Sequence, residues 1–293
     1  MKRIFLFIVT NLAVLALLSA VIFVIEQVFG VRLPQGSLGG LLVFAAVFGF
    51  GGALISLALS KWTAKHMMGV RVINQPQSEP ETWLIATVER LAARAGIGRP
   101  EIGIFDAEEM NAFATGARRN ASLVAVSTGL LRSMSRAQAE AVLGHEITHV
   151  ANGDMVTLAL LQGVLNTFVI FLARIIGGIV DRALLKNDRE GSGIGFFLTT
   201  MAAQLVLGIL ASIIVNWYSR RREFRADRGG ADLAGTGNMI GALEVLKGSH
   251  GEPMPPQMRA FGINGGRSGG FAQLFMSHPP LDERIAALRA VNG

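Results

Sequence analysis

The chain has 293 residues, of which 51% are hydrophobic and only 16% charged, and its net charge is +6. So apolar a composition is unusual for a soluble enzyme and indicates membrane spans. The absence of cysteine excludes disulfides and thiolate metal ligands, so any zinc must be held by histidine and carboxylate. The positive residues gather beside the apolar runs, as membrane topology requires, and no nucleic-acid recognition motif accompanies them. We therefore expect the lipid bilayer, and no nucleic acid, as a partner.

Two long apolar runs lie near the N-terminus. Residues 4–25 form the first, which is too long for the hydrophobic region of a signal peptide and contains no good cleavage site, so we expect a retained span. Residues 38–59 form the second, rich in glycine and alanine as packed membrane helices often are. A basic edge with an aromatic anchor follows and places this end in the cytoplasm: Lys61, Trp62, Lys65, His66 and Arg71.

Residues 71–154 are predicted to form a soluble α+β segment. Helical periodicity over 80–95 stops at Gly96. Three short strands are expected next, and a hairpin-type turn at 116–120 joins the last two of them. A further helix closes the segment, so the order is helix, small sheet, helix. The expected strands cover residues 101–105, 111–115 and 122–127.

Two more apolar runs, 155–180 and 194–215, flank a polar stretch at 181–192. Arg174 lies within the third run, where a charge is costly; a functional role, snorkelling and a packed structural role all fit it. The strongly basic stretch 219–227 after the fourth run again indicates the cytoplasm. Beyond it we expect a helix over 230–246, a mobile Gly/Pro-rich segment at 248–270 and a final helix from about Pro279.

The sequence His145-Glu146-Ile147-Thr148-His149 carries the clearest chemical signal. Histidines four residues apart lie on one face of a helix, so both imidazoles can bind one metal ion. Glu146 stands where it can take a proton from a metal-bound water, which is the zinc-hydrolase arrangement. A capping box at Ser135 and Gln138 and a stop at Gly153 supply the helix that this arrangement needs.

A catalytic zinc usually has a third protein ligand, which the residues alone do not single out. His66, His250 and His278 are candidates, although neither His66 nor His250 has a suitable neighbour. Glu223 and Asp227 lie one turn apart, so one could bind the metal while the other orients a ligand histidine. The alternative is a surface helix whose acids pair with its own arginines. Asp154 is another carboxylate that could be the third metal ligand, and the sequence does not distinguish it from Glu223 and Asp227.

Four motifs together resemble the HtpX membrane zinc metalloproteases, bacterial relatives of the CaaX prenyl endopeptidases. The first runs from His145 to Asp154, His-Glu-Ile-Thr-His-Val-Ala-Asn-Gly-Asp, between pairs of hydrophobic segments. The resemblance covers essentially the whole chain, in the right order. The other three motifs are Arg222-Glu-Phe-Arg-Ala-Asp227, Asn111-Ala-Phe-Ala-Thr-Gly116 and Ser277-His-Pro-Pro-Leu-Asp-Glu-Arg284.

This resemblance implies one Zn²⁺ per chain, bound by His145, His149 and Glu223, with Glu146 as catalytic base and Asp227 orienting a ligand. It also implies a mainly helical integral membrane protein of α+β class, with four hydrophobic segments and a zincin-like (gluzincin) cytoplasmic metalloprotease domain. The corresponding division is two spans in 1–60, the first part of the protease domain in 61–154, a membrane hairpin in 155–218 and the second part of the domain in 219–293. The expected location is the bacterial inner membrane, with the active site and both termini cytoplasmic.

The sequence allows more than one interpretation of the substrate contacts and of the function. The strand containing Asn111, Ala112, Phe113 and Ala114 is expected to offer a free edge to the substrate backbone, or else to be a purely structural hairpin. His278 or Arg284 could stabilise the oxyanion, with a helix cap and a surface salt bridge as the alternatives. We expect a zinc endopeptidase acting on membrane proteins from the cytoplasmic side, and the resemblance to the HtpX family implies a role in stress-linked quality control. The competing functions are a CaaX-type processing protease and a zinc-stabilised membrane scaffold, and the sequence leaves the oligomeric state undetermined.

Overall fold

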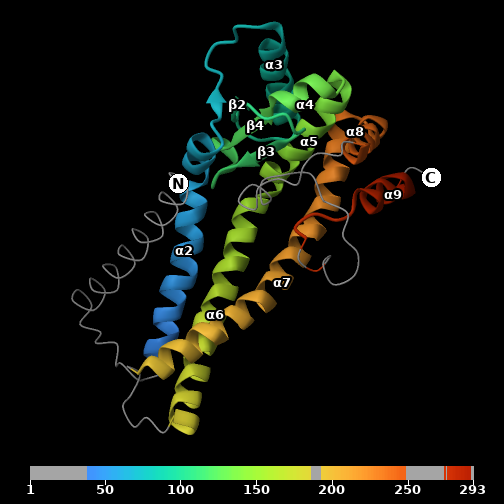
Figure 1. The fold of residues 1–293 in the computed structure, drawn as a ribbon. Helices are drawn as coiled ribbons and strands as arrows, with labels where there is room; N and C mark the ends of the chain where they lie inside the picture. Colours follow the sequence, from blue (N-terminus) through green and yellow to red (C-terminus); the bar gives the residue numbers. More distant parts are fainter. Residues whose placement is uncertain (1–37, 186–192, 249–273, 275, 292–293) are drawn as a thin grey trace. The chain divides into compact units, whose positions relative to one another are not determined.

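The computed structural model describes residues 38–185, 193–248, 274 and 276–291 (Figure 1). The predicted first span at 4–25 lies outside these residues, as does nearly all of the segment 248–270 that we expected to be mobile. The chain divides into two compact units. Of the described residues, those in 38–56 and 159–215 belong to the first, here called the helical unit, and those in 57–158 and from 216 onward to the second, the sheet unit.

Three helices in the described part of the chain are long and apolar enough to cross a membrane. They are α2 (Leu38–Met67), α6 (Asp154–Leu185) and α7 (Ile194–Ala234), and they confirm that the second, third and fourth predicted spans are helical. Their apolar side chains point outward rather than into a core; Phe168 and Leu205, for example, are 55% and 68% exposed. Such outward-facing side chains are what a lipid environment requires.

Arg174, the charged residue of the third span, packs within the helical unit. Its guanidinium carbon lies 4.2 Å from the centre of the Phe44 ring on α2, a cation–π contact. Of the roles that fitted Arg174 in the sequence, this contact supports the packed structural one.

The sheet unit is built around a sheet of four strands in the order β1-β2-β4-β3. The strand β2 pairs in parallel with β4, whereas β1 and β3 are antiparallel to their neighbours. The three predicted strands are confirmed, and β3 is at one edge of the sheet. The strand β1 was not predicted, because two residues are too few for an alternating pattern. The bounds are β1 (Arg71–Val72), β2 (Glu101–Phe105), β3 (Ala112–Thr115) and β4 (Leu123–Ser127).

The helix α5 (Arg136–Asn152) packs against β3 and α3 (Glu79–Arg94) and carries the two histidines. It begins and ends as predicted: Ser135 and Gln138 form a capping box, and Gly153 adopts a left-handed φ of 68° after the last turn. The inner face of α5 is fully buried, with Leu143 and Ile147 at 0% exposure. Two short helices accompany it, η1 (Arg119–Ala121) and α4 (Thr128–Ser133).

The C-terminal helices differ from the prediction at one point. A single helix was expected over 230–246, but α7 continues to Ala234 and a new helix, α8 (Thr236–Gly248), follows. Gly235 separates them with a φ of 96°, which ends a helix and favours glycine. The last helix, α9 (Leu281–Val291), starts two residues after Pro279, close to where it was expected, and packs on α8.

Candidate metal centre

Two helices approach closely at the centre of the sheet unit because glycine lies at the contact. A Cβ added at Gly230 of α7 would lie 3.0 Å from the backbone nitrogen of His145 on α5. A Cβ at Gly229 would lie 2.4 Å from Thr148. Both contacts are closer than side chains allow without a shift, so glycine at these positions lets α7 lie directly against α5. Glu223, two turns earlier on α7, then meets the histidines.

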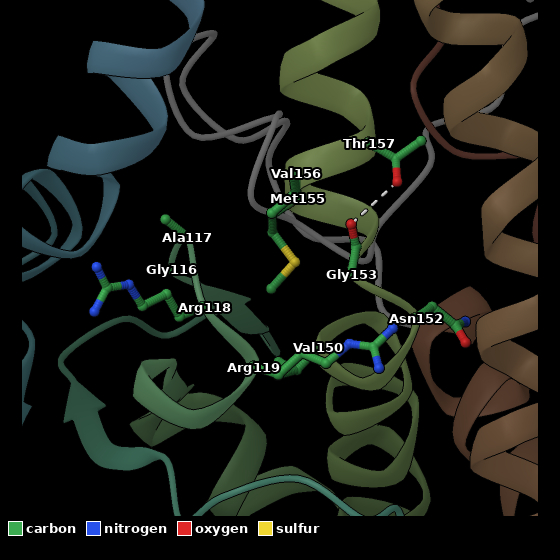
Figure 2. Close-up of a pocket in the computed structure, with 10 residues that line it drawn as sticks. All are labelled: Gly116, Ala117, Arg118, Arg119, Val150, Asn152, Gly153, Met155, Val156 and Thr157. Carbon is green, nitrogen blue, oxygen red and sulfur yellow. Dashed lines mark hydrogen bonds between the residues drawn. The ribbon is translucent and has the colours of Figure 1, made fainter.

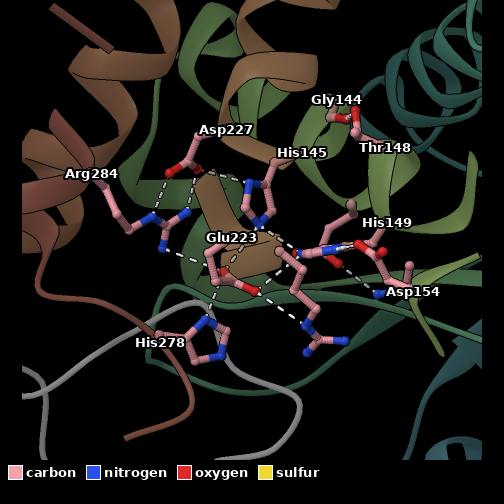
Figure 3. Close-up of polar contacts among 12 residues, drawn as sticks. Gly144, His145, Thr148, His149, Asp154, Glu223, Asp227, His278 and Arg284 are labelled. Carbon is pink, nitrogen blue, oxygen red and sulfur yellow. Dashed lines mark hydrogen bonds and ion pairs between the residues drawn. The ribbon is translucent and has the colours of Figure 1, made fainter. Parts of the chain in front are cut away.

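His145, His149 and Glu223 converge at one buried point (Figure 3). The Nε2 atoms of the two histidines are 3.2 Å apart. His149 Nε2 is 3.3 Å from Oε1 of Glu223, and His145 Nε2 is 3.5 Å from Oε2 of the same carboxylate. The exposed fractions of the three residues are 1%, 6% and 0% in the order named.

A carboxylate holds the outer nitrogen of each histidine. His145 Nδ1 lies 2.9 Å from Asp227 Oδ1, and His149 Nδ1 lies 2.7 Å from Asp154 Oδ2. A histidine whose Nδ1 donates its proton to a carboxylate turns the lone pair of Nε2 toward the centre. Asp227 is held in turn by Arg284, whose Nε donates to Oδ2 at 2.7 Å and whose Nη2 donates to Oδ1.

This donor set fits a zinc ion in size. Ligands about 2.0–2.1 Å from a tetrahedral metal lie roughly 3.3 Å from one another, which is close to the separation of the two Nε2 atoms and to the distance from each Nε2 to one oxygen of Glu223. The arrangement also fits in charge. The two Nε2 atoms and the carboxylate oxygens of Glu223 face one another in a buried space, and Oε1 of Glu223 receives no hydrogen bond from the residues that the structure describes. A cation between them would relieve this repulsion.

The electrostatics of the site also favour positive charge. Burial by itself lowers the pKa of His145, but its hydrogen bonds with Asp227 and Glu223 outweigh burial and raise that pKa to about 9. Burial likewise lowers the pKa of His149, and the charge of Glu223 raises it above the ordinary value. Both imidazoles therefore hold protons more tightly than a free histidine. A site that attracts protons in this way also attracts a metal cation, which would take their place.

Glu146 follows His145 on α5, and its side chain reaches the edge strand β3. Its Oε2 accepts a hydrogen bond of 2.8 Å from the backbone nitrogen of Ala114 on β3. Burial raises the pKa of Glu146 above its ordinary value, while the two histidines act in the opposite direction. A carboxylate with a raised pKa is better matched to proton transfer near neutral pH.

The edge strand turns alternate backbone groups away from the sheet. The carbonyl of Asn111 accepts from the backbone nitrogen of Ser127 on β4, and because strand residues alternate, the peptide groups of Ala112 and Ala114 point to the outer edge, with which no described strand pairs. The bond from Ala114 to Glu146 agrees with this alternation. Phe113 is buried among the side chains beneath the sheet, beside Phe105.

The remaining predicted site residues fall into two groups. His278 and Arg284 join the centre: His278 Nδ1 is 2.7 Å from Glu223 Oε2, and Arg284 is fully buried against Asp227. The readings of Arg284 as a surface salt bridge and of α7 as a surface helix are therefore wrong. His66 lies elsewhere, with its Nδ1 2.8 Å from the Trp62 carbonyl, and His250 is outside the described residues.

Comparison with known proteins agrees with this geometry. A sequence model of peptidase family M48 matches residues 78–292. Protease HtpX of Alkalilimnicola ehrlichii is 61% identical over 295 residues, covering 99% of this chain and 98% of that protein. The Protease HtpX homolog of Thiobacillus denitrificans is 61% identical over 291 residues, covering 99% of this chain and 100% of the relative.

The fold has a relative among solved structures. The crystal structure of S. mikatae Ste24p superimposes with a TM-score of 0.62 at 19% identity, covering 92% of this chain and 66% of that one. Membrane-capable helices joined to an α+β unit that holds a buried His-His-Glu cluster define a membrane metalloprotease. The chain belongs to peptidase family M48, and its resemblance to the HtpX proteases is confirmed.

Proposed function

We propose that this chain is a zinc endopeptidase that hydrolyses misfolded or damaged membrane proteins from the cytoplasmic side, in stress-linked quality control of the bacterial inner membrane. The observation that carries the proposal is the triangle of His145 Nε2, His149 Nε2 and the Glu223 carboxylate, with edges of 3.2–3.5 Å, beside the buried carboxylate of Glu146. A purely structural zinc site would need no such base. Glu146 therefore favours an enzyme over a zinc-stabilised scaffold.

His145, His149 and Glu223 would hold the zinc, with Asp227 and Asp154 keeping the two imidazoles in the required tautomer and orientation. When bound, zinc supplies Lewis acidity, lowering the pKa of water toward ~7 and polarising the peptide carbonyl. Glu146 accepts the proton of the attacking water and delivers it to the leaving nitrogen. Before substrate binds, the amide of Ala114 holds the Glu146 carboxylate at the edge of the sheet.

The oxyanion of the reaction needs a hydrogen-bond donor from the chain. Arg284 is a poor candidate, because it directs two of its nitrogens at Asp227. His278 is better placed, since its Nδ1 contacts Glu223 while its Nε2 is buried and has no hydrogen-bond partner in the described part of the chain. We assign the oxyanion contact to His278, and the holding of Asp227 to Arg284.

The free edge of β3 suits an extended substrate backbone, which would pair with the outward peptide groups of Ala112 and Ala114. Only an unfolded or extended segment can pair in this way, so damaged proteins fit better than folded ones.

The metal ligands also lie close in sequence to the membrane spans. Met155, at the start of the third apolar run, is at most ~20 Å of chain from His149, and Glu223 is about 9 Å along α7 from Trp217. Substrates held in the same membrane gain effective concentration at such a site.

Purified protein is expected to contain one zinc per chain and to cleave an unfolded membrane-protein substrate. Removing the metal with a chelator should abolish cleavage, and adding back zinc should restore it, since the proposed mechanism needs the metal both to activate water and to polarise the carbonyl. Metal content by mass spectrometry and cleavage by gel assay measure both effects. Undiminished cleavage by metal-free protein would refute the zinc mechanism, and full zinc content without any cleavage would support a scaffold instead.

The proposed topology places residues 181–192 on the side of the membrane opposite the metal centre, because basic residues follow the second and fourth spans. The chain lacks cysteine, so single substitutions can be labelled cleanly. Asn187→Cys should react with an impermeant maleimide only from the periplasm, and Glu108→Cys in the sheet unit only after the membrane is opened. Labelling of position 187 from the cytoplasm alone would mean that the third and fourth segments do not fully cross.

A further inference from the structure

A cavity of about 300 Å³ lies where β3 ends, between the turn that follows β3 and the junction of α5 with α6 (Figure 2). All of it belongs to the sheet unit. Apolar atoms of Ala117, Val150, Met155 and Val156 form much of its wall, and Figure 2 shows the sulfur of Met155 turned toward its middle. The cavity is therefore large enough for an amino-acid side chain and partly apolar.

The cavity is also positively charged. Its lining residues include two arginines, Arg118 and Arg119, and no acid. Two guanidinium nitrogens of Arg119 lie 3.9 Å from where a Cβ on Gly153 would stand, so this side chain lies against the end of α5. Figure 2 shows Arg119 reaching toward Asn152, whereas Arg118 is directed to the opposite side.

Arg119 has no ion-pair partner among the residues that the structure describes. Arg71 and Arg90 of the same unit, by contrast, are paired, with Glu81 at 2.6 Å and with Glu140 at 2.9 Å. An unpaired arginine in a partly enclosed cavity is suited to binding a carboxylate from outside.

The strand β3 and the helix α5 both run from the catalytic residues to the cavity, so they give the distance between the two. Ala114 of β3 contacts Glu146 of α5, and both elements reach the cavity further along, at Gly116 and at Val150. Two strand residues advance about 7 Å and four helical residues about 6 Å. An extended substrate that is cleaved beside Glu146 and follows β3 would therefore bring its second or third residue from the cleaved bond over the cavity.

We propose that this cavity is a substrate subsite that selects an acidic side chain two or three residues from the cleaved bond, with Arg119 as the residue that determines the selection. The methylene groups of a glutamate would contact the apolar wall, and its carboxylate would reach Arg119. The inference rests on the proposed path of the substrate along β3. Anionic lipid headgroups would also be attracted by arginine, but the alignment of the cavity with β3 and Glu146 favours a peptide.

The test uses a set of extended peptides, soluble in detergent, with glutamate, glutamine or lysine at each position up to three residues on either side of the cleaved bond. We expect glutamate to raise kcat/KM over lysine by about fivefold at one position, the ratio that a partly exposed ion pair supplies. Arg119→Gln should remove this preference while leaving cleavage of the glutamine peptide nearly unchanged. Arg119→Glu should reverse it, so that lysine is preferred at that same position.

Arg132→Glu is the matched control, since it makes the same charge change at an exposed arginine outside the cavity. It should leave the preference for glutamate intact. Peptide binding to the Glu146→Gln variant, by fluorescence anisotropy, separates the subsite from the chemistry. If binding shows no glutamate preference that depends on Arg119, the subsite is refuted even when peptides are cleaved. An Arg119 effect that appears only with anionic lipid, equally for all peptides, would indicate a lipid site and likewise overturn the proposal.

Discussion

Replacing Glu146 by glutamine is expected to reduce peptide hydrolysis by about 10²–10⁴-fold, the contribution of a general base. The amide has nearly the shape of the carboxylate and can still accept the hydrogen bond from Ala114. It cannot accept a proton from water. Zinc content should remain at one per chain, because Glu146 contributes no atom to the ligand triangle. Initial rates on an unfolded substrate and metal analysis of the same preparation measure both quantities.

The control for this variant is Glu140→Gln, the same change on the same helix. Glu140 pairs with Arg90 near the surface, and its loss should change the rate by less than about twofold, since surface ion pairs contribute little. A Glu146→Gln rate within a few fold of wild type would exclude Glu146 as the base. Loss of zinc in Glu146→Gln would instead mean that the carboxylate belongs to the metal site.

The parts of the fold that local signals determine could be predicted from the sequence. The helix α5 is an example, because its capping box at Ser135 and its stop at Gly153 act within a few residues. The break at Gly235 was missed because the apolar pattern continues across it, and a single glycine in a helical pattern is often tolerated. The two-residue strand β1 forms only through its pairing with β2, so no local pattern predicts it.

The candidate site divides in the same way. The two histidines and Glu146 are recognisable because a helix fixes their relative positions. The carboxylate that faces them comes from a helix distant in sequence. Because Glu223, Asp227 and Asp154 all offer a carboxylate, only the packing of α7 on α5 distinguishes the metal ligand among them. The contacts separate them: Glu223 faces the Nε2 atoms, whereas Asp227 and Asp154 each face an Nδ1. The glycines at 229 and 230, which permit this packing, were the signal available in the sequence.

Substituting alanine for His145, His149 or Glu223 is expected to remove zinc and activity together. Each change leaves only two protein ligands, and we expect zinc affinity to fall by more than about 100-fold, beyond the range for a residue that only orients a ligand. Asp154→Asn and Asp227→Asn should weaken zinc binding by about 10–100-fold, because each histidine loses the charge that fixes its tautomer. Competition with a chromophoric chelator measures all five affinities.

Folding must be measured beside metal binding, because Asp227 is also the partner of a buried arginine. Arg284 is fully buried, and weakening its bidentate contact with Asp227 leaves a charge that is costly to bury. Asp227→Asn should therefore lower the unfolding temperature more than Asp154→Asn, whose partner at the surface, Arg225, is 3.7 Å away and exposed. Abolished zinc binding in folded Asp227→Asn, together with retained zinc in Glu223→Ala, would mean that the two acids of α7 have the opposite roles. The triangle of Nε2 atoms and carboxylate would then not be the metal site.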